Sequence, residues 1–322
     1  MSQILVIRGG AIGDFILTLP VLAALRAAFP TARLEVLGYA HIAELARSGG
    51  LADGVRAIDS RALAGFFADG GDLDDAMADY FASFAVILSY LYDPDAVFRL
   101  NVARCSPAQF IQGPHRPDES GGQHATQALL KPLERLAIWD ADPSPRLALE
   151  PDTGAGPAES NAGAVQLALH PGSGSERKNW PENRWAELLQ RLAGKPEIRL
   201  LLVGGEAEGS RIDRLAAMVP ANRVETACHW PLPVLARRLA ACDGFVGHDS
   251  GITHLAAAVG LPGLVLWGDS IEAIWRPSSP RMRVLRDPAG LGHLPVDRVL
   301  EAVESLVAGL RVCARTDSGL AG

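Results

Sequence analysis

Four short apolar runs in this chain are each followed by glycines and polar residues that could bind anions or transfer protons. These following stretches are "GGAIGD" after Arg8, "PGSGSERK" after His170, "EAEGSR" after Gly205 and "HDSGITH" after Gly247. Glycine lets the backbone approach a ligand closely, and a helix that begins after such a loop presents free N–H groups to an anion. These four places are the candidate functional loops.

The second loop carries the components of a pyrophosphate site. Gly172 and Gly174 allow close backbone approach, Ser173 and Ser175 supply hydroxyl donors, and Lys178 supplies a positive charge. A helix is expected to begin directly afterwards, with its positive end toward the loop. The spacing differs from that of a Walker loop, GxxxxGK[ST]. The competing interpretation is a surface loop without a ligand.

The fourth loop also fits a phosphate. Asp249, Ser250 and Gly251 form a turn whose N–H groups can point at an anion, and His254 follows on the first turn of the next helix. In the competing interpretation Asp249 is only the N-cap of that helix and His254 is structural.

The first and third loops present carboxylates. Asp14 stands at a helix entrance, either as a catalytic group or as a structural N-cap. Its loop is not GxGxxG, so a dinucleotide fingerprint fits weakly. Glu206 and Glu208 follow a strand end, where an acid can accept hydrogen bonds from ribose hydroxyls, although acids are also enriched near helix starts.

Strands and helices alternate along the chain, which predicts parallel sheets covered by helices. The strands expected in the first half are "QILVIR", "RLEVLG" and "FAVILSY", and those in the second half are "VQLALH", "IRLLLVGG", "DGFVG" and "GLVLWG". Helices are expected in the second half at residues 182–192, 209–218, 232–241 and 251–259. Residues 143–163 are rich in Pro, Gly, Ala and Ser, which indicates a linker between two α/β halves and a ligand cleft between them.

Pro20 disturbs the helix expected after the first loop. Either it kinks a helix that begins near Asp14, or the regular helix begins near Thr18 with Pro20 in its first turn. At the other end of the chain, the last nine residues show no apolar periodicity and are expected to be frayed.

Composition excludes several classes of protein. The chain has 322 residues, of which 48% are hydrophobic and 21% charged, as in a globular protein without spanning helices. A net charge of -7 argues against general nucleic-acid binding. No HExxH, CxxC or GxSxG motif occurs, so neither a metal-centred mechanism nor a serine hydrolase elbow is supported. The four cysteines are far apart, and we expect a cytoplasmic protein.

Three stretches together resemble glycosyltransferase family nine, whose best-known members are heptosyltransferases. They are "GAIGDFILTLPVLAALR", "HPGSGSERKNWP" and "GHDSGITHLAAAVGLPGLVLWG". The resemblance implies a GT-B fold: two Rossmann-like α/β domains whose parallel sheets face each other across a cleft. Residues 1–155 would form the acceptor-binding domain and residues 163–322 the nucleotide-sugar-binding domain.

The resemblance also implies the reaction, an inverting and metal-independent transfer of a heptose from ADP-heptose to a cell-envelope saccharide such as the lipopolysaccharide inner core. Asp14 would be the catalytic base and Lys178 would hold the donor phosphate. No cofactor besides the donor is implied. The donor site would comprise Gly172, Ser173, Gly174, Ser175, Lys178, Glu206, Asp249, Ser250, Gly251 and His254, with Glu208 as the alternative to Glu206.

Acceptor recognition is less clearly indicated. Gly13 and Asp14 would face the acceptor, and Arg116, with Arg99, Arg104 and His115, offers positive charge to an anionic saccharide or glycolipid, although a solvated loop explains these residues equally well. The expected partners are the donor and the acceptor, not a nucleic acid, with peripheral contact at the cytoplasmic face of the inner membrane. The alternatives are a sugar-nucleotide epimerase or hydrolase and an inactive nucleotide-sugar-binding protein.

Overall fold

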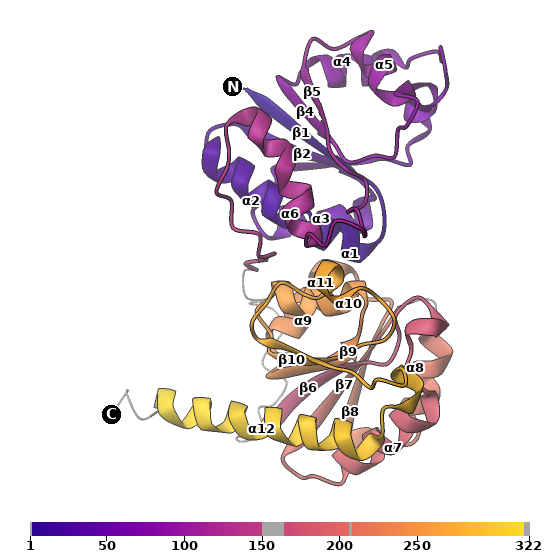
Figure 1. Cartoon of the computed structure of the whole chain (residues 1–322), viewed down its shortest axis with the longest axis vertical. Helices are drawn as coiled ribbons and strands as arrows, with labels where there is room; N and C mark the ends of the chain where they lie inside the picture. Colours follow the sequence, from indigo (N-terminus) through magenta and orange to yellow (C-terminus); the bar gives the residue numbers. More distant parts are fainter. Residues whose placement is uncertain (1, 150–163, 206–207, 319–322) are drawn as a thin grey trace. The chain divides into compact units, whose positions relative to one another are not determined.

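The polypeptide divides into two units, residues 1–149 and 150–322, each built around its own parallel sheet. The structure is a computed structural model, and it describes residues 2–149, 164–205 and 208–318 (Figure 1). The predicted domain ends at residues 155 and 163, and most of the predicted linker, lie outside the described residues.

The first unit contains a five-stranded sheet in the order β3-β2-β1-β4-β5, all parallel. Its strands are β1 (Gln3–Arg8), β2 (Arg33–Gly38), β3 (Gly54–Ala57), β4 (Val86–Ser89) and β5 (Gln109–Gln112). Its helices are α1 (Ile12–Ile16), α2 (Leu19–Ala28), α3 (Ala40–Ser48), α4 (Asp75–Ala82), α5 (Val97–Ala103) and α6 (Ala125–Leu130), with 3₁₀ turns η1 (Arg61–Phe67) and η2 (Lys131–Leu136).

Alternate residues of the central strand β1 face two different layers. Leu5 and Ile7 pack with side chains of η1, α4 and α5 in one apolar cluster that includes Phe66 and Phe81. The helices α2, α3 and α6 lie on the other side of the sheet (Figure 1). The continuous apolar run of β1 is therefore explained by burial on both faces.

The entrance of the first helix matches the second of the two alternatives for Pro20. A short helix, α1, contains Asp14 and ends at Ile16, and α2 then begins with Thr18 as its N-cap and Pro20 in its first turn. Pro20 is tolerated there because the N–H groups of a first turn have no partner within the helix. Asp14 and the long apolar helix therefore belong to separate elements.

The second unit contains a six-stranded parallel sheet in the order β11-β10-β9-β6-β7-β8. Its strands are β6 (Val165–His170), β7 (Ile198–Gly204), β8 (Val224–Cys228), β9 (Gly244–His248), β10 (Gly263–Leu266) and β11 (Met282–Leu285). Its helices are α7 (Glu182–Ala193), α8 (Gly209–Ala216), α9 (Leu232–Ala240), α10 (Gly251–Ala258), α11 (Glu272–Trp275) and α12 (Val296–Ser318), with 3₁₀ turns η3 (Glu176–Lys178), η5 (Ala221–Arg223) and η6 (Leu291–His293).

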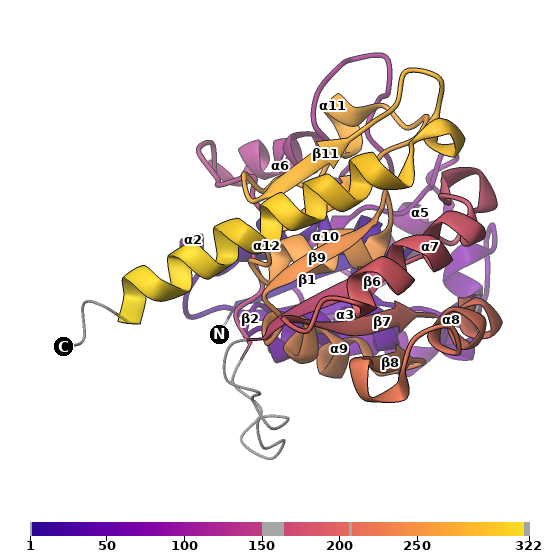
Figure 2. The ribbon, with the colours of Figure 1, turned by 90° about the horizontal axis from the view of Figure 1, so that it is seen from below.

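Two helical layers cover this sheet. The helices α7, α8 and α12 share one apolar cluster with β6 and β7, and α9 and α10 lie on the opposite face (Figures 1 and 2). In α7 the buried residues Trp185, Leu188, Leu189 and Leu192 recur at three- and four-residue steps, which aligns one apolar face with the sheet.

The C-terminal helix differs from the sequence expectation. Residues 314–318 continue α12 to Ser318, although their sequence has no apolar periodicity. Buried residues of α12 such as Val299 and Val303 anchor its earlier turns on the sheet, and helix propagation is far cheaper than nucleation. Residues 319–322 lie outside the described residues. None of the helices in the described ranges has the length and apolar character needed to cross a bilayer.

Both sheets follow the doubly wound strand order. In each, the chain runs outward in one direction through three strands and then returns to the other side of the first strand. In open sheets of this kind ligands bind beyond the carboxyl ends of the strands, where the order reverses. The reversal falls between β1 and β4 in the first unit and between β6 and β9 in the second. The first, second and fourth candidate loops follow β1, β6 and β9, so they begin at these reversal points.

Candidate functional site

The second and fourth candidate loops follow β6 and β9, the two strands at the reversal point of the second sheet. His170, the last residue of β6, is paired with Gly247 of β9, so both loops leave the sheet at the same edge. The two loops therefore begin next to each other. The site is assembled from neighbouring strand ends of one rigid sheet.

An ion pair joins the two loops. Lys178 Nζ lies 2.6 Å from Asp249 Oδ2, and Asp249 is buried while Lys178 is about one third exposed. The hydroxyl of Ser270, in the loop after β10, donates to the same carboxylate oxygen at 2.6 Å. The structure thus brings together two of the predicted donor residues. It adds Ser270, which sequence reasoning missed although it too follows a strand end.

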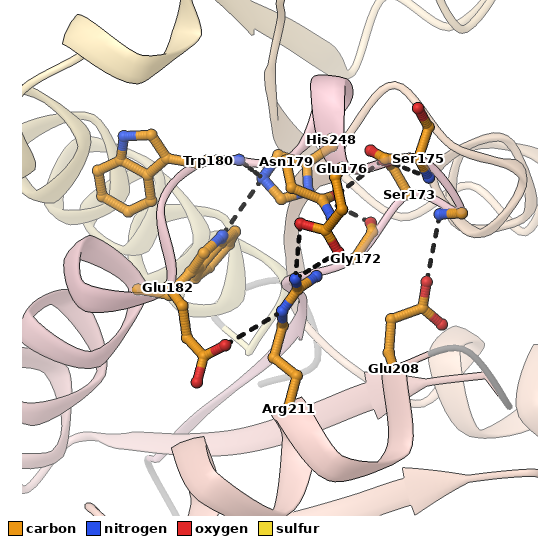
Figure 3. A network of polar contacts seen from close by, with 12 residues as sticks. Gly172, Ser173, Ser175, Glu176, Asn179, Trp180, Glu182, Glu208, Arg211 and His248 are labelled. Carbon is orange, nitrogen blue, oxygen red and sulfur yellow. Dashed lines mark hydrogen bonds and ion pairs between the residues drawn. The ribbon is translucent and has the colours of Figure 1, made fainter.

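The loop between Gly172 and Lys178 is held by contacts to its backbone (Figure 3). The Gly174 N–H donates to Glu208 Oε1 at 3.2 Å, and the Gly174 φ of +72° is a left-handed value that favours glycine. The Ser173 hydroxyl donates to Asn179 Oδ1 at 2.7 Å. A Cβ on Gly172 would come within 2.2 Å of Glu208 Cγ, so a side chain there would displace Glu208.

Glu208 acts on the backbone in this structure. Its Oε2 accepts the Gly205 N–H at 3.1 Å while its Oε1 accepts the Gly174 N–H, so this carboxylate joins the loop after β7 to the loop after β6. Glu206, the other predicted ribose ligand, lies outside the described residues. Ser175 is the N-cap of η3, the 3₁₀ turn that carries Lys178.

Arg211 of α8 also contacts the segment that contains this loop, a contact that sequence reasoning missed. Its Nη2 donates to both Glu176 oxygens, at 2.7 and 2.9 Å, and its Nε donates to Glu182 Oε2 at 3.4 Å (Figure 3). Arg214 adds a second guanidinium on Glu182. Because Glu176 is exposed, these ion pairs contribute orientation and only a small part of the stability.

The fourth loop forms the N-terminus of α10. The N-cap is Ser250, whose hydroxyl oxygen accepts the Thr253 N–H at 3.3 Å, and Gly251 is the first helical residue. The interpretation of Asp249 as a plain N-cap is therefore wrong, and its carboxylate is available to Lys178 instead. His254 is buried on this helix.

Two buried histidines end β6 and β9. His170 Nδ1 lies 3.2 Å from the Ser250 hydroxyl, and His248 contacts the Gly172 carbonyl and two tryptophans. Burial lowers the pKa of His170 to about 4 and the pKa of His248 to about 3. Both imidazoles are therefore neutral near pH 7.

Because both histidines are buried in the neutral form, we expect the second unit to lose stability at acidic pH. Their pKa values in the folded state lie below the unfolded value of 6.5, so their contribution is complete above pH 6.5 and is lost as the pH falls toward 4. We expect the free energy of unfolding to fall by about 2.5 kcal/mol in total between pH 7.5 and 5.5. Urea denaturation at several pH values measures this slope. His170→Asn should remove about half of it, and an unchanged slope would contradict the assignment.

Asp14 lies in α1, the helix that follows β1, and β1 is one of the two strands at the reversal point of the first sheet. It is at the third position of α1, whose N-cap is Ala11, so the interpretation of Asp14 as the N-cap is wrong. Its Oδ2 nevertheless accepts the Ala11 N–H at 3.0 Å. Gly10, with a φ of +98°, would place a Cβ 2.7 Å from Asp14 Oδ2. Gly13 lies within the same helix.

The buried Arg8, the last residue of β1, contacts Asp14. Arg8 Nη2 lies 3.5 Å from Asp14 Oδ1, and Arg8 Nε donates to the Asp14 carbonyl oxygen at 3.3 Å. Its Nη1 donates to the carbonyl oxygen of His115 at 2.8 Å. Burial lowers the pKa of Arg8. Arg8 thus brings the predicted base and the segment around His115 together, a role that the sequence did not reveal.

The other predicted acceptor residues have separate surroundings. Arg116 is exposed and lies 3.8 Å from Glu119. Arg104 donates to the Gly71 carbonyl oxygen at 2.7 Å and to Asn101 Oδ1, so it joins α5 to the loop after η1. Arg99 is an exposed residue of α5. Arg8 connects Asp14 to the segment of His115 and Arg116, because it contacts both the Asp14 carboxylate and the His115 carbonyl oxygen.

Among the described residues, no group of three or more His, Cys, Asp or Glu side chains is arranged to hold a metal ion. The Arg211 guanidinium is paired with Glu176 and Glu182, whereas Lys178 and the N-terminus of α10 lie where the two loops meet. Positive charge for a bound anion would come from Lys178 and this helix N-terminus.

Comparison with known proteins finds a family match and several similar proteins. Residues 118–295, more than half of the chain, match the model of glycosyltransferase family 9 (heptosyltransferase). Lipopolysaccharide heptosyltransferase 1 of Pseudomonas aeruginosa is 36% identical over 34% of this chain and 31% of its own length. The enzyme of that name from Escherichia coli K12 is 32% identical over 46% of each chain.

The aligned part of the chain thus spans about a third to a half of the length of these curated relatives. A solved structure of ADP-heptose lipopolysaccharide heptosyltransferase II from E. coli superposes with a TM-score of 0.75 and 18% identity, over 95% of this chain and 99% of that one. This likeness shows the fold, which is the two-domain GT-B fold expected from the sequence.

Proposed function

The chain belongs to glycosyltransferase family 9, and from this premise we propose that it transfers a heptose from ADP-heptose to a cell-envelope saccharide, with inversion and without a metal ion. The observation that carries the proposal is the contact of Lys178 with Asp249, which joins two glycine-bearing loops at the strand reversal of the second sheet. Relatives named lipopolysaccharide heptosyltransferases support the transferred sugar and the acceptor class.

The second unit would bind the donor. Lys178 and the N-terminus of α10, with Ser250 and Gly251, would hold the diphosphate, and the N–H groups around Gly172 and Ser173 would add donors. The leaving nucleoside diphosphate gains negative charge as the glycosidic bond breaks, so these groups stabilise the transition state more than the ground state. Asp249 would receive the sugar end of the donor, with Ser270 fixing its carboxylate.

The first unit would supply the base. An inverting transfer needs a group that accepts the proton of the attacking hydroxyl while the diphosphate leaves from the opposite face of the sugar. In this proposal Asp14 accepts that proton, with its carboxylate oriented by the Ala11 N–H and by Arg8. Gly13 and Arg116 contact the acceptor, which carries negative charge.

The expected place of this reaction is the cytoplasmic face of the inner membrane, where a glycolipid acceptor would be presented, and the protein would touch the membrane only peripherally. The donor and acceptor are its partners, and no nucleic acid is involved.

A thermal-shift panel tests the donor assignment. ADP and ADP-heptose should raise the unfolding temperature, because a ligand that binds only the folded state stabilises it according to its occupancy. UDP, GDP and CMP should have a smaller effect at the same concentration. A larger shift with UDP, or no shift with any of these nucleotides, would exclude the ADP-heptose proposal.

A further inference from the structure

His248 lies where β9 ends and contacts the loop after β6, and it has no role in the chemistry proposed above. It is the last residue of β9 and is fully buried. Its Nε2 accepts the backbone N–H of Trp180 at 2.9 Å and the indole N–H of Trp185 at 3.2 Å. Its Nδ1 lies 3.2 Å from the carbonyl oxygen of Gly172 (Figure 3).

These three contacts fix the tautomer of the ring. A nitrogen that accepts two N–H groups carries no proton, so the single proton of the neutral imidazole is on Nδ1 and is donated to the Gly172 carbonyl. Burial lowers the pKa of His248, which keeps the ring in this neutral form. The Trp185 ring packs edge-on against the imidazole, with a centroid distance of 5.4 Å.

The two backbone partners of His248 flank the predicted phosphate ligand. Gly172 precedes Lys178 and Trp180 follows it, so one ring holds both ends of the segment that carries the ammonium group. The next residue after His248 is Asp249, which binds that ammonium. Two consecutive residues at the end of β9 therefore hold this segment: His248 binds its two ends, and Asp249 binds Lys178.

A second histidine makes the reciprocal contact. His170 ends β6 and reaches Ser250 in the loop after β9, while His248 ends β9 and reaches Gly172 in the loop after β6. The strands β6 and β9 are hydrogen-bonded neighbours. The histidine at the end of each strand therefore contacts the loop that follows the other strand.

We propose that His248 is a positioning residue for donor binding: it fixes both ends of the 172–180 segment and thereby holds Lys178 in place for a diphosphate. The proposal rests on the donor site proposed above, but the fixation of the segment can be measured without a ligand. A residue that acts this way should affect ADP affinity through loop order rather than through direct contact.

Two substitutions that resemble histidine in shape separate the bond of His248 to Gly172 from its bond to Trp180. In His248→Asn the amide nitrogen can replace Nδ1 and keep the bond to Gly172, whereas in His248→Gln the amide oxygen can replace Nε2 and keep the bond to Trp180. His248→Phe keeps neither. Val303→Ala, which removes buried volume from α12 in the same unit, is the control for general destabilisation.

Two measurements on the full-length variants test the proposal: hydrogen exchange of residues 171–181 without ligand, and ADP affinity by calorimetry. We expect faster exchange in this segment and an ADP Kd raised about tenfold by His248→Phe and a few-fold by each amide variant, since each lost hydrogen bond has a modest effect. Val303→Ala should lower the Tm and leave both quantities unchanged.

The outcomes distinguish this inference from the donor proposal. If the wild-type protein does not bind ADP, the donor proposal fails, and the exchange of residues 171–181 then decides the role of His248. Unchanged exchange in this segment in all three variants would overturn the positioning role. So would an ADP Kd that changes only as much as in Val303→Ala, in a protein that binds ADP.

Discussion

Replacing Asp14 with asparagine is expected to lower the rate of sugar transfer by about 10³-fold and to leave ADP affinity unchanged, because a positioned general base contributes factors of this order. Asparagine has nearly the same shape, and its amide oxygen can still accept the Ala11 N–H that now bonds to Asp14 Oδ2. The groups proposed to hold the diphosphate, Lys178 and Asp249, belong to the other unit. Transfer measured at saturating donor, together with ADP calorimetry, separates the two effects.

The same substitution has a small structural cost that can be measured. Arg8 loses its carboxylate partner at 3.5 Å but keeps its bonds to the carbonyl oxygens of Asp14 and His115. Since Asp14 is about one third exposed, solvent screening limits this loss to about 1 kcal/mol. Asp53→Asn, in the same unit, removes a carboxylate paired with Arg26 and serves as the control. Transfer within tenfold of the wild type in Asp14→Asn would show that the base is another group.

The second large effect is expected from Lys178→Met. Its ammonium is the cation that the structure places between the two loops, 2.6 Å from Asp249. Without it the diphosphate would lose its point-charge partner, so we expect the ADP Kd to rise about tenfold or more and turnover to fall by about 10²-fold to 10³-fold. The loss in turnover should exceed the loss in affinity, because charge accumulates on the leaving group in the transition state.

Lys195→Met provides a matched control for this variant. It removes the same charge from a similarly exposed lysine of the second unit, one that pairs with Glu304 instead of the loop after β9. ADP affinity and turnover should stay at the wild-type values. If the two lysine variants lose ADP affinity equally, the effect of Lys178 is one of general charge and the proposed phosphate contact is wrong.

The sequence predicted the interior of both sheets and missed their edges. The strands read as continuous apolar runs are β1, β2 and β4 in the first sheet and β6, β7, β9 and β10 in the second. The four that were missed, β3, β5, β8 and β11, are the edge strands. An edge strand has a partner on one side only and several partly exposed residues, such as Glu225 in β8, so it lacks a continuous apolar signal.

The same reasoning explains which parts of the site were predictable. Glycines and polar residues directly after an apolar run mark a strand end, and this signal located Asp14, Lys178 and Asp249. Residues that act from elsewhere carry no such local signal. Arg211 reaches Glu176 from α8, and His248 is hidden within an apolar strand, where its bonds to Gly172 and Trp180 depend on strand pairing.

In the function proposed here the protein is a transferase that needs an acceptor. The most direct test is to incubate the purified protein with ADP-heptose, with and without a lipopolysaccharide inner-core acceptor that lacks heptose, and to measure ADP release and the mass of the acceptor. We expect ADP release only with the acceptor, and an acceptor heavier by one heptose. ADP release at the same rate without an acceptor, with no change in acceptor mass, would rule out a transferase and favour a hydrolase.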